Sequence, residues 1–396
     1  MGFFGKKIEP KLDFLETLEH FIPIRYELIL EAIQNDSNLD ASEKERLLNM
    51  GVLFQSIFHQ EYFQDLQHLK TAFVPFNPDV ESVFEKDFSE EEKEKNRQVL
   101  MTGIEHLLTI GNYNSLTTDQ LNECLALQPM GGLSVLVNLE KFSQFTVFYR
   151  GVRQVERPYR LFYLLKRTRS IKELKRVCVV ARYKSEFGGN ILVKLFKEVA
   201  VEDLKVVTPE VKLRLPIFDK VKLGGTFLAS VGAAVWKILL GTLGLPLLLA
   251  GLIGYLVKII LGFLNSRTKC MQKFSQSLYS QSLSNNVGAL AMLIDQAEVQ
   301  EVKEALLAYM FLYLHRNDHY TMDQIDKSVE KWLLDNFKFP IDFEVDDAIR
   351  KLLEKNIGTK TLADDDELLE KYEVLPLDDA LQTLHEYWNQ LGVSGT

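Results

Sequence analysis

GALAMLIDQAEVQEVKEALLAYMFLYL, residues 288–314, has the clearest helical pattern in the chain. Its apolar residues recur at the three- and four-residue spacing of one helix face, at positions 290, 293, 294, 297, 302, 305, 306 and 309. The pattern predicts a long amphipathic helix that packs one face against other parts of the chain. This helix follows a basic, apolar region and precedes an acidic one.

Charge is strongly segregated along the 396 residues, although the net charge is only −9. Residues 1–140 carry 11 Lys and Arg against 24 Asp and Glu, a balance of −13, whereas residues 141–222 carry 20 against 8, a balance of +12. Residues 223–284 carry 5 against 0, and residues 285–396 carry 10 against 23, which gives +5 and −13. The order indicates more than one kind of domain, and three widely spaced cysteines argue against a disulfide framework.

Residues 223–264 form an apolar run in which Lys237 and Lys258 are the two charged residues. Gly241 and Pro246 divide the run into two arms of about 20 residues, and each arm is long enough to span a bilayer. The run therefore predicts a transmembrane helical hairpin. The alternative is a buried helical hairpin in a large soluble domain.

The residues that flank the predicted hairpin favour a membrane interface. The expected interface residues are Lys220, Lys222, Trp236, Lys237, Lys258, Arg267, Lys269 and Lys273. Small residues at four-residue spacing, Gly225, Ala229 and Ala233, predict close helix packing within the hairpin or between copies. The positive-inside rule places both flanking regions on the cytoplasmic face of a bacterial inner membrane, or on the matrix face of a mitochondrial inner membrane.

The rest of the chain is predicted to form three parts. Residues 1–128 have helical periodicity, with Ser89 as a candidate N-cap. Residues 129–222 contain β-branched and aromatic stretches that predict a small, mostly antiparallel α+β domain. Residues 265–396 predict a stalk helix and an acidic winged-helix-like domain, in which Thr321 caps a helix. The predicted fold class is thus an α+β membrane protein.

Three kinds of partner suit the basic α+β domain: anionic lipid headgroups, the acidic parts of the same chain, and nucleic acid. Headgroups are favoured because the domain leads directly into the apolar run. Aromatic residues alternate with basic ones as in an RNA-binding sheet, but a half-buried strand gives the same alternation, so nucleic acid is not expected. The acidic charge of the winged-helix-like domain also opposes phosphate binding. That acidic domain is expected to bind a protein, and the small-residue arm allows a homo-oligomer.

The sequence contains no pattern that indicates catalysis. His315 and His319 have the spacing of a helical metal pair, but no glutamate completes a metalloprotease signature. The acidic run at residues 364–367 lacks the alternating ligand spacing of a calcium loop. We therefore expect no catalytic residue, metal or cofactor, and a non-enzymatic scaffold or interaction role. A pore-forming or membrane-perturbing effector and a lipid-modifying enzyme are the alternatives.

Several short motifs resemble the transmembrane protein 143 family in their order. They are Phe148-Tyr149-Arg150-Gly151, Lys194-Leu195-Phe196-Lys197, Asp203-Leu204, Asp219-Lys220, Asn286, Ala297-Glu298, Glu301 with the run from Lys303 to Tyr309, and Asp342-Phe343. Residues 198–200 are Glu-Val-Ala where the family has Asn-Ile-Pro. The resemblance extends over nearly the whole chain from about Pro23. It implies a membrane protein of bacteria or mitochondria with a domain of unknown function, and it implies no catalytic residues.

Overall fold

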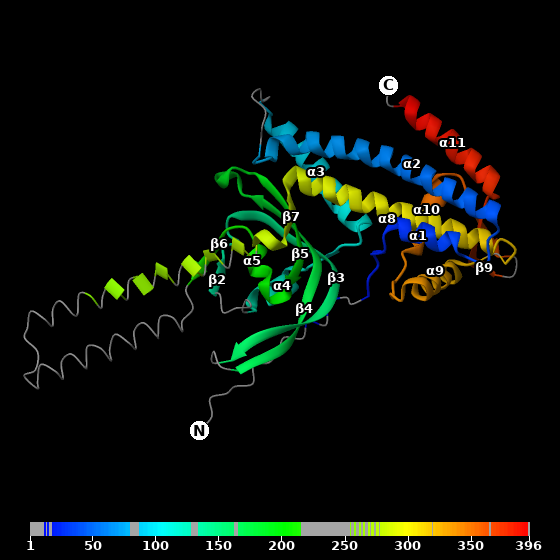
Figure 1. The fold of residues 1–396 in the computed structure, drawn as a ribbon. Helices are drawn as coiled ribbons and strands as arrows, with labels where there is room; N and C mark the ends of the chain where they lie inside the picture. The colour runs from blue at the N-terminus through cyan, green and yellow to red at the C-terminus, as the bar shows by residue number, and fades with distance from the viewer. Residues whose placement is uncertain are drawn as a thin grey trace, which may run out of the picture.

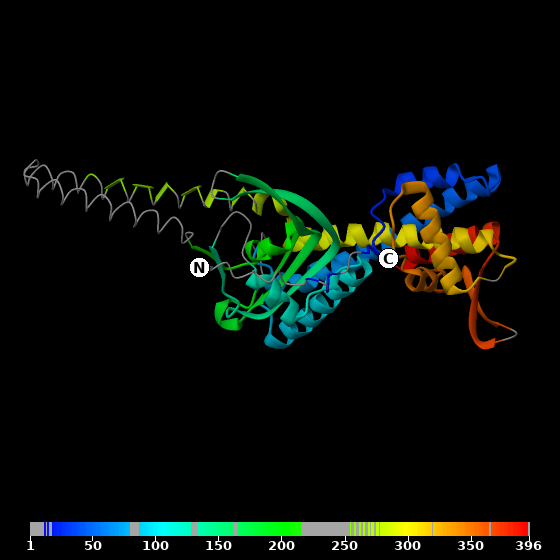
Figure 2. The same ribbon diagram turned by 90° about the horizontal axis from the view of Figure 1, so that it is seen from below.

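A computed structural model describes residues 18–79, 87–127, 134–161, 165–214, 278–318, 320–363 and 366–394, with isolated positions at 12, 14 and 15 and between 254 and 276. The described chain combines a group of long helices with an antiparallel sheet (Figure 1). One helix, α8 (Asn286–Leu314), runs from the sheet into the C-terminal helices (Figure 2).

The N-terminal region is helical because its sequence repeats apolar residues at helical spacing and caps each long helix. The elements are α1 (Tyr26–Gln34), α2 (Ala41–Phe73), the 3-10 helix η1 (Val74–Phe76), α3 (Glu90–Ile110) and α4 (Thr118–Ala126). Asp40, Ser89 and Thr117 each form a capping box with the residue three positions later. The prediction of Ser89 as an N-cap is confirmed.

The main sheet has five antiparallel strands in the order β1-β3-β4-β5-β7. These strands are β1 (Asn114–Ser115), β3 (Phe142–Leu161), β4 (Leu165–Tyr183), β5 (Ile191–Ala200) and β7 (Ser282–Asn285). The mixed helical and antiparallel-sheet character predicted from the sequence is confirmed. However, β1 comes from the N-terminal region and β7 follows the apolar run, so the sheet extends beyond residues 129–222 at both edges.

Short elements complete the region around the sheet. They are β2 (Ser134–Val137), η3 (Ser185–Phe187), η4 (Val201–Asp203), α5 (Leu204–Val207) and β6 (Val211–Arg214). Strands β2 and β6 pair with each other in a separate two-stranded sheet.

Side chains alternate between the two faces of the main sheet along each strand. Each face packs against a different hydrophobic core. On β4, Cys178 and Val180 belong to the large core that also contains residues of α2, α3 and α8. Val177 and Val179 belong to a second core, which contains residues of α4 and α5. The sheet therefore lies between a layer of long helices and a layer of short ones.

The start of α8 is fixed by Asn286, directly after β7. Asn286 has the left-handed φ of +49°, and its side-chain oxygen accepts a hydrogen bond from the backbone N–H of Val193 at 3.3 Å. Further along, every residue from 300 to 312 is buried. The sequence pattern predicted one buried face, whereas α8 is buried on all sides here because α2, α9, α10 and β9 surround it.

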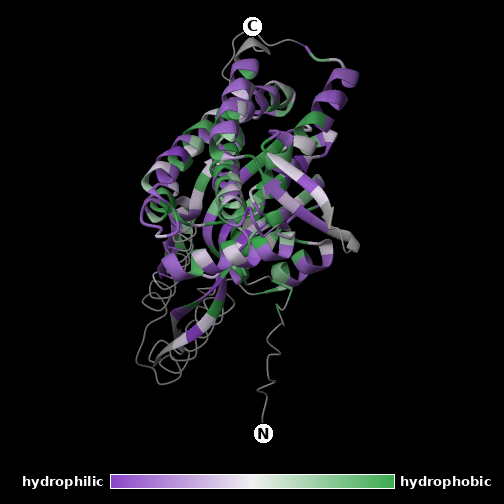
Figure 3. Cartoon of the chain, turned by 90° about the vertical axis from the view of Figure 1, so that its right-hand side faces the viewer, coloured by the Kyte–Doolittle hydropathy of each residue, from purple (hydrophilic) through white to green (hydrophobic). Residues whose placement is uncertain are grey.

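The C-terminal region continues with α9 (Met322–Phe337), α10 (Val345–Glu354), β8 (Gly358–Ala363), β9 (Asp366–Val374) and α11 (Leu377–Ser394). Thr321 caps α9 through a capping box with Gln324, as predicted. Strands β8 and β9 form a hairpin, and α11 packs on α2. Hydrophobic residues gather toward the middle of the molecule, and hydrophilic residues lie mostly outside (Figure 3).

The predicted two-helix transmembrane hairpin requires correction. Within the part of the chain that the structure describes, no helix is both long enough and apolar enough to cross a membrane. Helices α2 and α8 have 33 and 29 residues, but both carry charged residues along their length, and a span needs about 20 mostly apolar residues. The described residues thus form a mixed helical and antiparallel-sheet fold, and no transmembrane hairpin is found among them. Most of residues 223–264 lie outside the described residues.

We expect α8 to join the sheet and the C-terminal helices into one cooperative unit. Leu290 lies near the start of α8, Leu306 lies in the enclosed stretch 300–312 beside Gly51 of α2, and both are fully buried. Leu290→Ala and Leu306→Ala should each lower the free energy of unfolding by about 2–5 kcal/mol. Chemical denaturation followed by circular dichroism should show a single transition for both variants.

Leu334→Ala is the matched control, because Leu334 is 45% exposed on α9 and should change stability by less than about 0.5 kcal/mol. Two separate transitions, with each variant shifting only one of them, would show that α8 does not couple the two regions.

Candidate functional site

The outer parts of β3 and β4 form a two-stranded ribbon that projects from the sheet, away from the long helices (Figure 1). We call residues 152–161 and 165–174 the basic ribbon. Its register runs from Val152 opposite Leu174 to Leu161 opposite Leu165. Pairing between β4 and β5 stops at Glu173, so most of the ribbon extends past the neighbouring strand.

The basic ribbon carries seven basic residues against Glu156 and Glu173, a balance of +5. The basic residues are Arg153, Arg157, Arg160, Lys166, Arg167, Arg169 and Lys172. The register places Arg157 directly opposite Arg169, and Arg160 directly opposite Lys166. Like charges at opposite positions destabilise a pair of strands, by about 0.2–1 kcal/mol for each pair. Glu173 offsets this effect at Arg157, so Arg160 opposite Lys166 is the pair of positions at which the register is unfavourable.

Internal carboxylates neutralise the inner end of the ribbon. Glu173 is 2% exposed and accepts hydrogen bonds from Arg153 Nε at 2.6 Å and from Arg157 Nη2 at 2.5 Å. Just inside the ribbon, Lys175 forms an ion pair with Glu19 of the N-terminal segment. These contacts make the ribbon rigid where it leaves the sheet. Arg160, Lys166 and Arg167 lie farther out, next to the turn.

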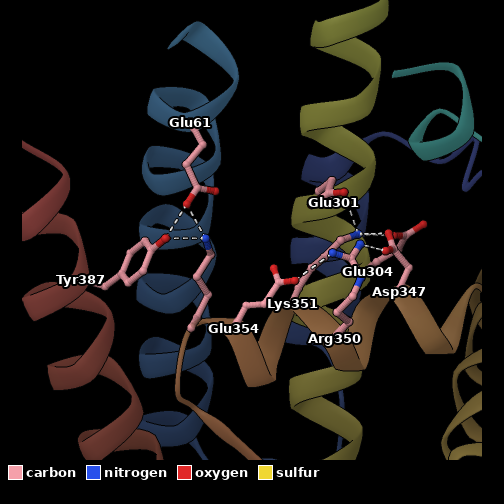
Figure 4. Close-up of polar contacts among 9 residues, drawn as sticks. Glu61, Glu301, Glu304, Asp347, Arg350, Lys351, Glu354 and Tyr387 are labelled. Atoms are coloured by element: carbon pink, nitrogen blue, oxygen red, sulfur yellow. Dashed lines mark hydrogen bonds and ion pairs between the residues drawn. The ribbon is translucent and has the colours of Figure 1, made fainter. Parts of the chain in front are cut away.

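A second group of charged residues lies inside the molecule, where α8 contacts α10 (Figure 4). Lys351 is 2% exposed, and its Nζ lies 2.7 Å from Glu304, 3.1 Å from Glu301 and 2.7 Å from Asp347. Glu304 also accepts a hydrogen bond from Gln300 at 2.6 Å. The group crosslinks two helices through one buried ammonium.

The charges in this group change one another's pKa. Burial raises the pKa of the Glu301 and Glu304 carboxyls, although the charge of Lys351 opposes the effect. Burial lowers the pKa of Lys351, but the charges of Glu304, Glu301 and Asp347 outweigh it, and the pKa lies above its ordinary value. Lys351 therefore stays protonated, and its charge stabilises the ionised forms of Glu301 and Glu304.

Two further polar contacts join distant parts of the chain. Lys355 at the end of α10 pairs with Glu61 of α2, and both contact the Tyr387 hydroxyl of α11 at 3.0 and 2.7 Å (Figure 4). On the sheet side, Arg150 of β3 donates to the Gly111 carbonyl at 2.7 Å and to Gln296 of α8 at 2.9 Å. Each contact links α2, α8 or α10 to another element, which indicates structural roles.

Three motif residues of the resemblance take part in these internal contacts, namely Arg150, Glu301 and Glu304. The run from Lys303 to Tyr309 lies in the buried part of α8, and Asn286 starts that helix. One sequence signal indicates this arrangement, because the charged residues Glu301, Lys303 and Glu304 interrupt the apolar repeat. The opposing charges of the ribbon could not be found from the sequence, since they depend on strand register.

Most of the predicted membrane-interface and helix-packing residues lie outside the described part of the chain. Lys258 and Lys269 occupy exposed helical positions. The residues outside the described part of the chain are Lys220, Lys222, Gly225, Ala229, Ala233, Trp236, Lys237, Arg267 and Lys273. Their proposed roles stay predictions.

Of the two histidines considered as a weak metal pair, the structure describes His315 and not His319. His315 contacts Asp318 at 3.2 Å and stacks on Tyr320, with ring centroids 4.2 Å apart. His319 lies outside the described residues. Among the residues that the structure places, no group of three His, Cys, Asp or Glu side chains could hold a metal ion.

Comparison with known proteins now adds one finding. Residues 144–288 match the family model of a protein of unknown function, DUF3754. The matched segment begins in β3, contains β4, β5 and β7, and ends at the start of α8. A domain of unknown function is thus confirmed, while nothing supports the transmembrane protein 143 family specifically. No solved structure matches the chain.

Lys351→Met tests whether the buried ammonium stabilises the fold. The variant leaves Glu301 and Glu304 buried without their cation, so we expect a loss of about 3–5 kcal/mol at pH 8. Removing Lys351 also raises the folded-state pKa of both carboxyls further above the unfolded value. Protonation then relieves the penalty, so the loss should be clearly smaller at pH 5. Urea denaturation at both pH values measures this difference.

Lys327→Met provides the control, because Lys327 forms an exposed ion pair with Asp323 that contributes about 1 kcal/mol or less. An equal loss at pH 5 and pH 8 for Lys351→Met would contradict the assigned role of the two glutamates.

Proposed function

We propose that the protein is a non-enzymatic interaction protein that docks on an anionic lipid surface through the basic ribbon. The supporting observation is the basic charge at the outer end of the ribbon, where Arg160 lies directly opposite Lys166 and Arg167 is next in sequence. Like charges at opposite positions are unfavourable in a pair of strands, and phosphate headgroups would offset that cost. Each basic residue near an anionic surface contributes about 1 kcal/mol to binding.

The sequence between the two strands of the ribbon favours lipid over the other partners considered. Residues 161–165 are Leu-Phe-Tyr-Leu-Leu in sequence, and Arg160 and Lys166 flank them. An apolar, aromatic stretch between basic residues is typical of segments that enter the boundary between headgroups and acyl chains. A nucleic-acid partner would satisfy the charges but would give these apolar residues little benefit.

The acidic parts of the chain support the same orientation. The described contacts of Glu19 and Glu173 involve the inner end of the ribbon. Residues 1–140 and 285–396 each carry −13 and would be repelled by an anionic surface. The protein would therefore present the ribbon to the lipid and turn its helices toward the aqueous phase. Three further expectations stay predictions. They are binding of a protein by the C-terminal region, self-association, and a bacterial or mitochondrial membrane location.

Vesicle binding by the full-length protein tests this proposal. A triple variant, Arg160→Gln with Lys166→Gln and Arg167→Gln, removes three charges near the turn. At about 1 kcal/mol for each charge, its partitioning onto phosphatidylserine-containing vesicles should fall about 100-fold at low salt. Its folding stability should be unchanged or slightly higher, because the opposing Arg160 and Lys166 charges are gone. Vesicle flotation and urea denaturation provide the two measurements.

A matched variant, Lys327→Gln with Lys331→Gln and Lys360→Gln, removes three charges from the acidic C-terminal region and should bind as the wild type does. Binding that is equal for the two triple variants, or equal on neutral phosphatidylcholine vesicles, would overturn the proposal. Tight, ribbon-dependent binding to RNA or DNA with no preference for anionic vesicles would do so as well.

A further inference from the structure

A pocket of about 360 Å³ lies between the segment before α1, helix α2 and helix α8. Residues 21–27 form one side, and Gln55 and residues 298–303 contribute to the others. This volume falls within the range of small-molecule sites, roughly 300–1,000 Å³. The pocket lies in the helical region and contains no residue of the basic ribbon.

One part of the pocket wall is apolar. Ile22, Ile24 and Val302 are buried and line it, while Val299 is partly exposed. Val299, which is 38% exposed, gives this wall an accessible apolar surface from which a hydrocarbon chain could displace water, whereas Ile22 and Val302 are almost completely covered. Burial of each CH₂ group contributes about 0.8 kcal/mol in the general case.

The polar part of the pocket is formed by Lys303. Its side chain is almost fully buried, and Nζ donates a hydrogen bond to the Ile22 carbonyl at 2.9 Å. Nζ also lies 5.2 Å from the centre of the Phe21 ring. Within the described residues Lys303 forms no ion pair. The adjacent carboxylate, Glu304, is already bonded to Gln300 and Lys351.

A second cation shares the same aromatic ring. The guanidinium of Arg150 lies 3.6 Å from the centre of the Phe21 ring, and its hydrogen bonds go to the neutral groups of Gly111 and Gln296. Burial, and then the charge of Arg150, lower the pKa of Lys303 to about 8. Glu27 and Glu298 also line the pocket, but Glu27 pairs with Arg25 and Glu298 contacts His59, so among the described residues neither forms an ion pair with Lys303. Burying a charge without an anion is costly.

We infer that this pocket binds a monocarboxylic acid with an apolar chain. The carboxylate lies toward Lys303 Nζ, and the chain lies against the apolar wall at Ile24 and Val299. A single negative charge suits the site, because Arg25 at the pocket already pairs with Glu27. The inference is independent of lipid docking by the basic ribbon, since neither site shares a residue with the other.

Calorimetric titration of the full-length protein with octanoate at pH 7 tests the assignment, with octanol as the neutral analogue. A hydrogen bond to a charged group favours octanoate over octanol by about 10- to 100-fold in affinity. Lys303→Met should bring that ratio close to one, whereas Lys303→Arg should retain a preference for octanoate. Lys327→Met, an exposed substitution far from the pocket, should leave the ratio unchanged.

A measurement on the wild type keeps the test decisive if Lys303→Met does not fold. Octanoate should slow the acetylation of Lys303 by an amine-specific reagent at least fivefold, while Lys327 reacts at the same rate with and without octanoate. Mass spectrometry of the modified peptides reports both rates. No preference for octanoate over octanol, or equal labelling of Lys303 with and without octanoate, would overturn the inference.

The pH dependence gives a further check. The charged groups that act on Lys303 are Arg150 of β3, Glu27 of α1 and Glu304 of α8. Because the pKa of Lys303 is about 8, the ammonium loses its proton between pH 7 and pH 9. The affinity for octanoate should fall up to about tenfold over that range, and an affinity that rises with pH would contradict the assignment.

Discussion

The burial of charged side chains along α8 is the constraint on which the rest of the structure depends. A helix that is enclosed on every side over residues 300–312 must satisfy Glu301, Lys303 and Glu304 without water. Lys351 of α10 does so for the two glutamates, and the Ile22 carbonyl does so in part for Lys303. The positions of α10 and of the segment before α1 follow from these requirements.

This constraint also separates the two kinds of charge in the molecule. Charges around α8 have specific internal partners and fix the position of one element against another. At the outer end of the basic ribbon, Arg160 lies opposite the like charge of Lys166 on the neighbouring strand. The first kind stabilises the fold, and the second is the basis of the proposed lipid contact. The pocket at Lys303 lies between these cases, because a buried cation there has a carbonyl and a ring as its partners.

Much of the local structure could be predicted from the sequence. Ser89 and Thr321 cap helices as their positions indicated, because capping depends on residues three positions apart. The alternating stretches around Cys178 and Val193 are strands of one antiparallel sheet. The two edges of that sheet could not be predicted, since β1 and β7 are two and four residues long and come from distant parts of the chain. The complete enclosure of α8 was missed because it depends on tertiary packing, and the transmembrane hairpin required correction.

The place of β7 in the sheet has a consequence for chain continuity. Strand β5 ends at Ala200, and β7 pairs beside it although about eighty residues intervene in sequence. Residues up to Leu195 and residues from Ala289 onward belong to one shared core. The strand ladder and this core therefore bring together two flanking pieces of the chain, which the intervening residues join covalently.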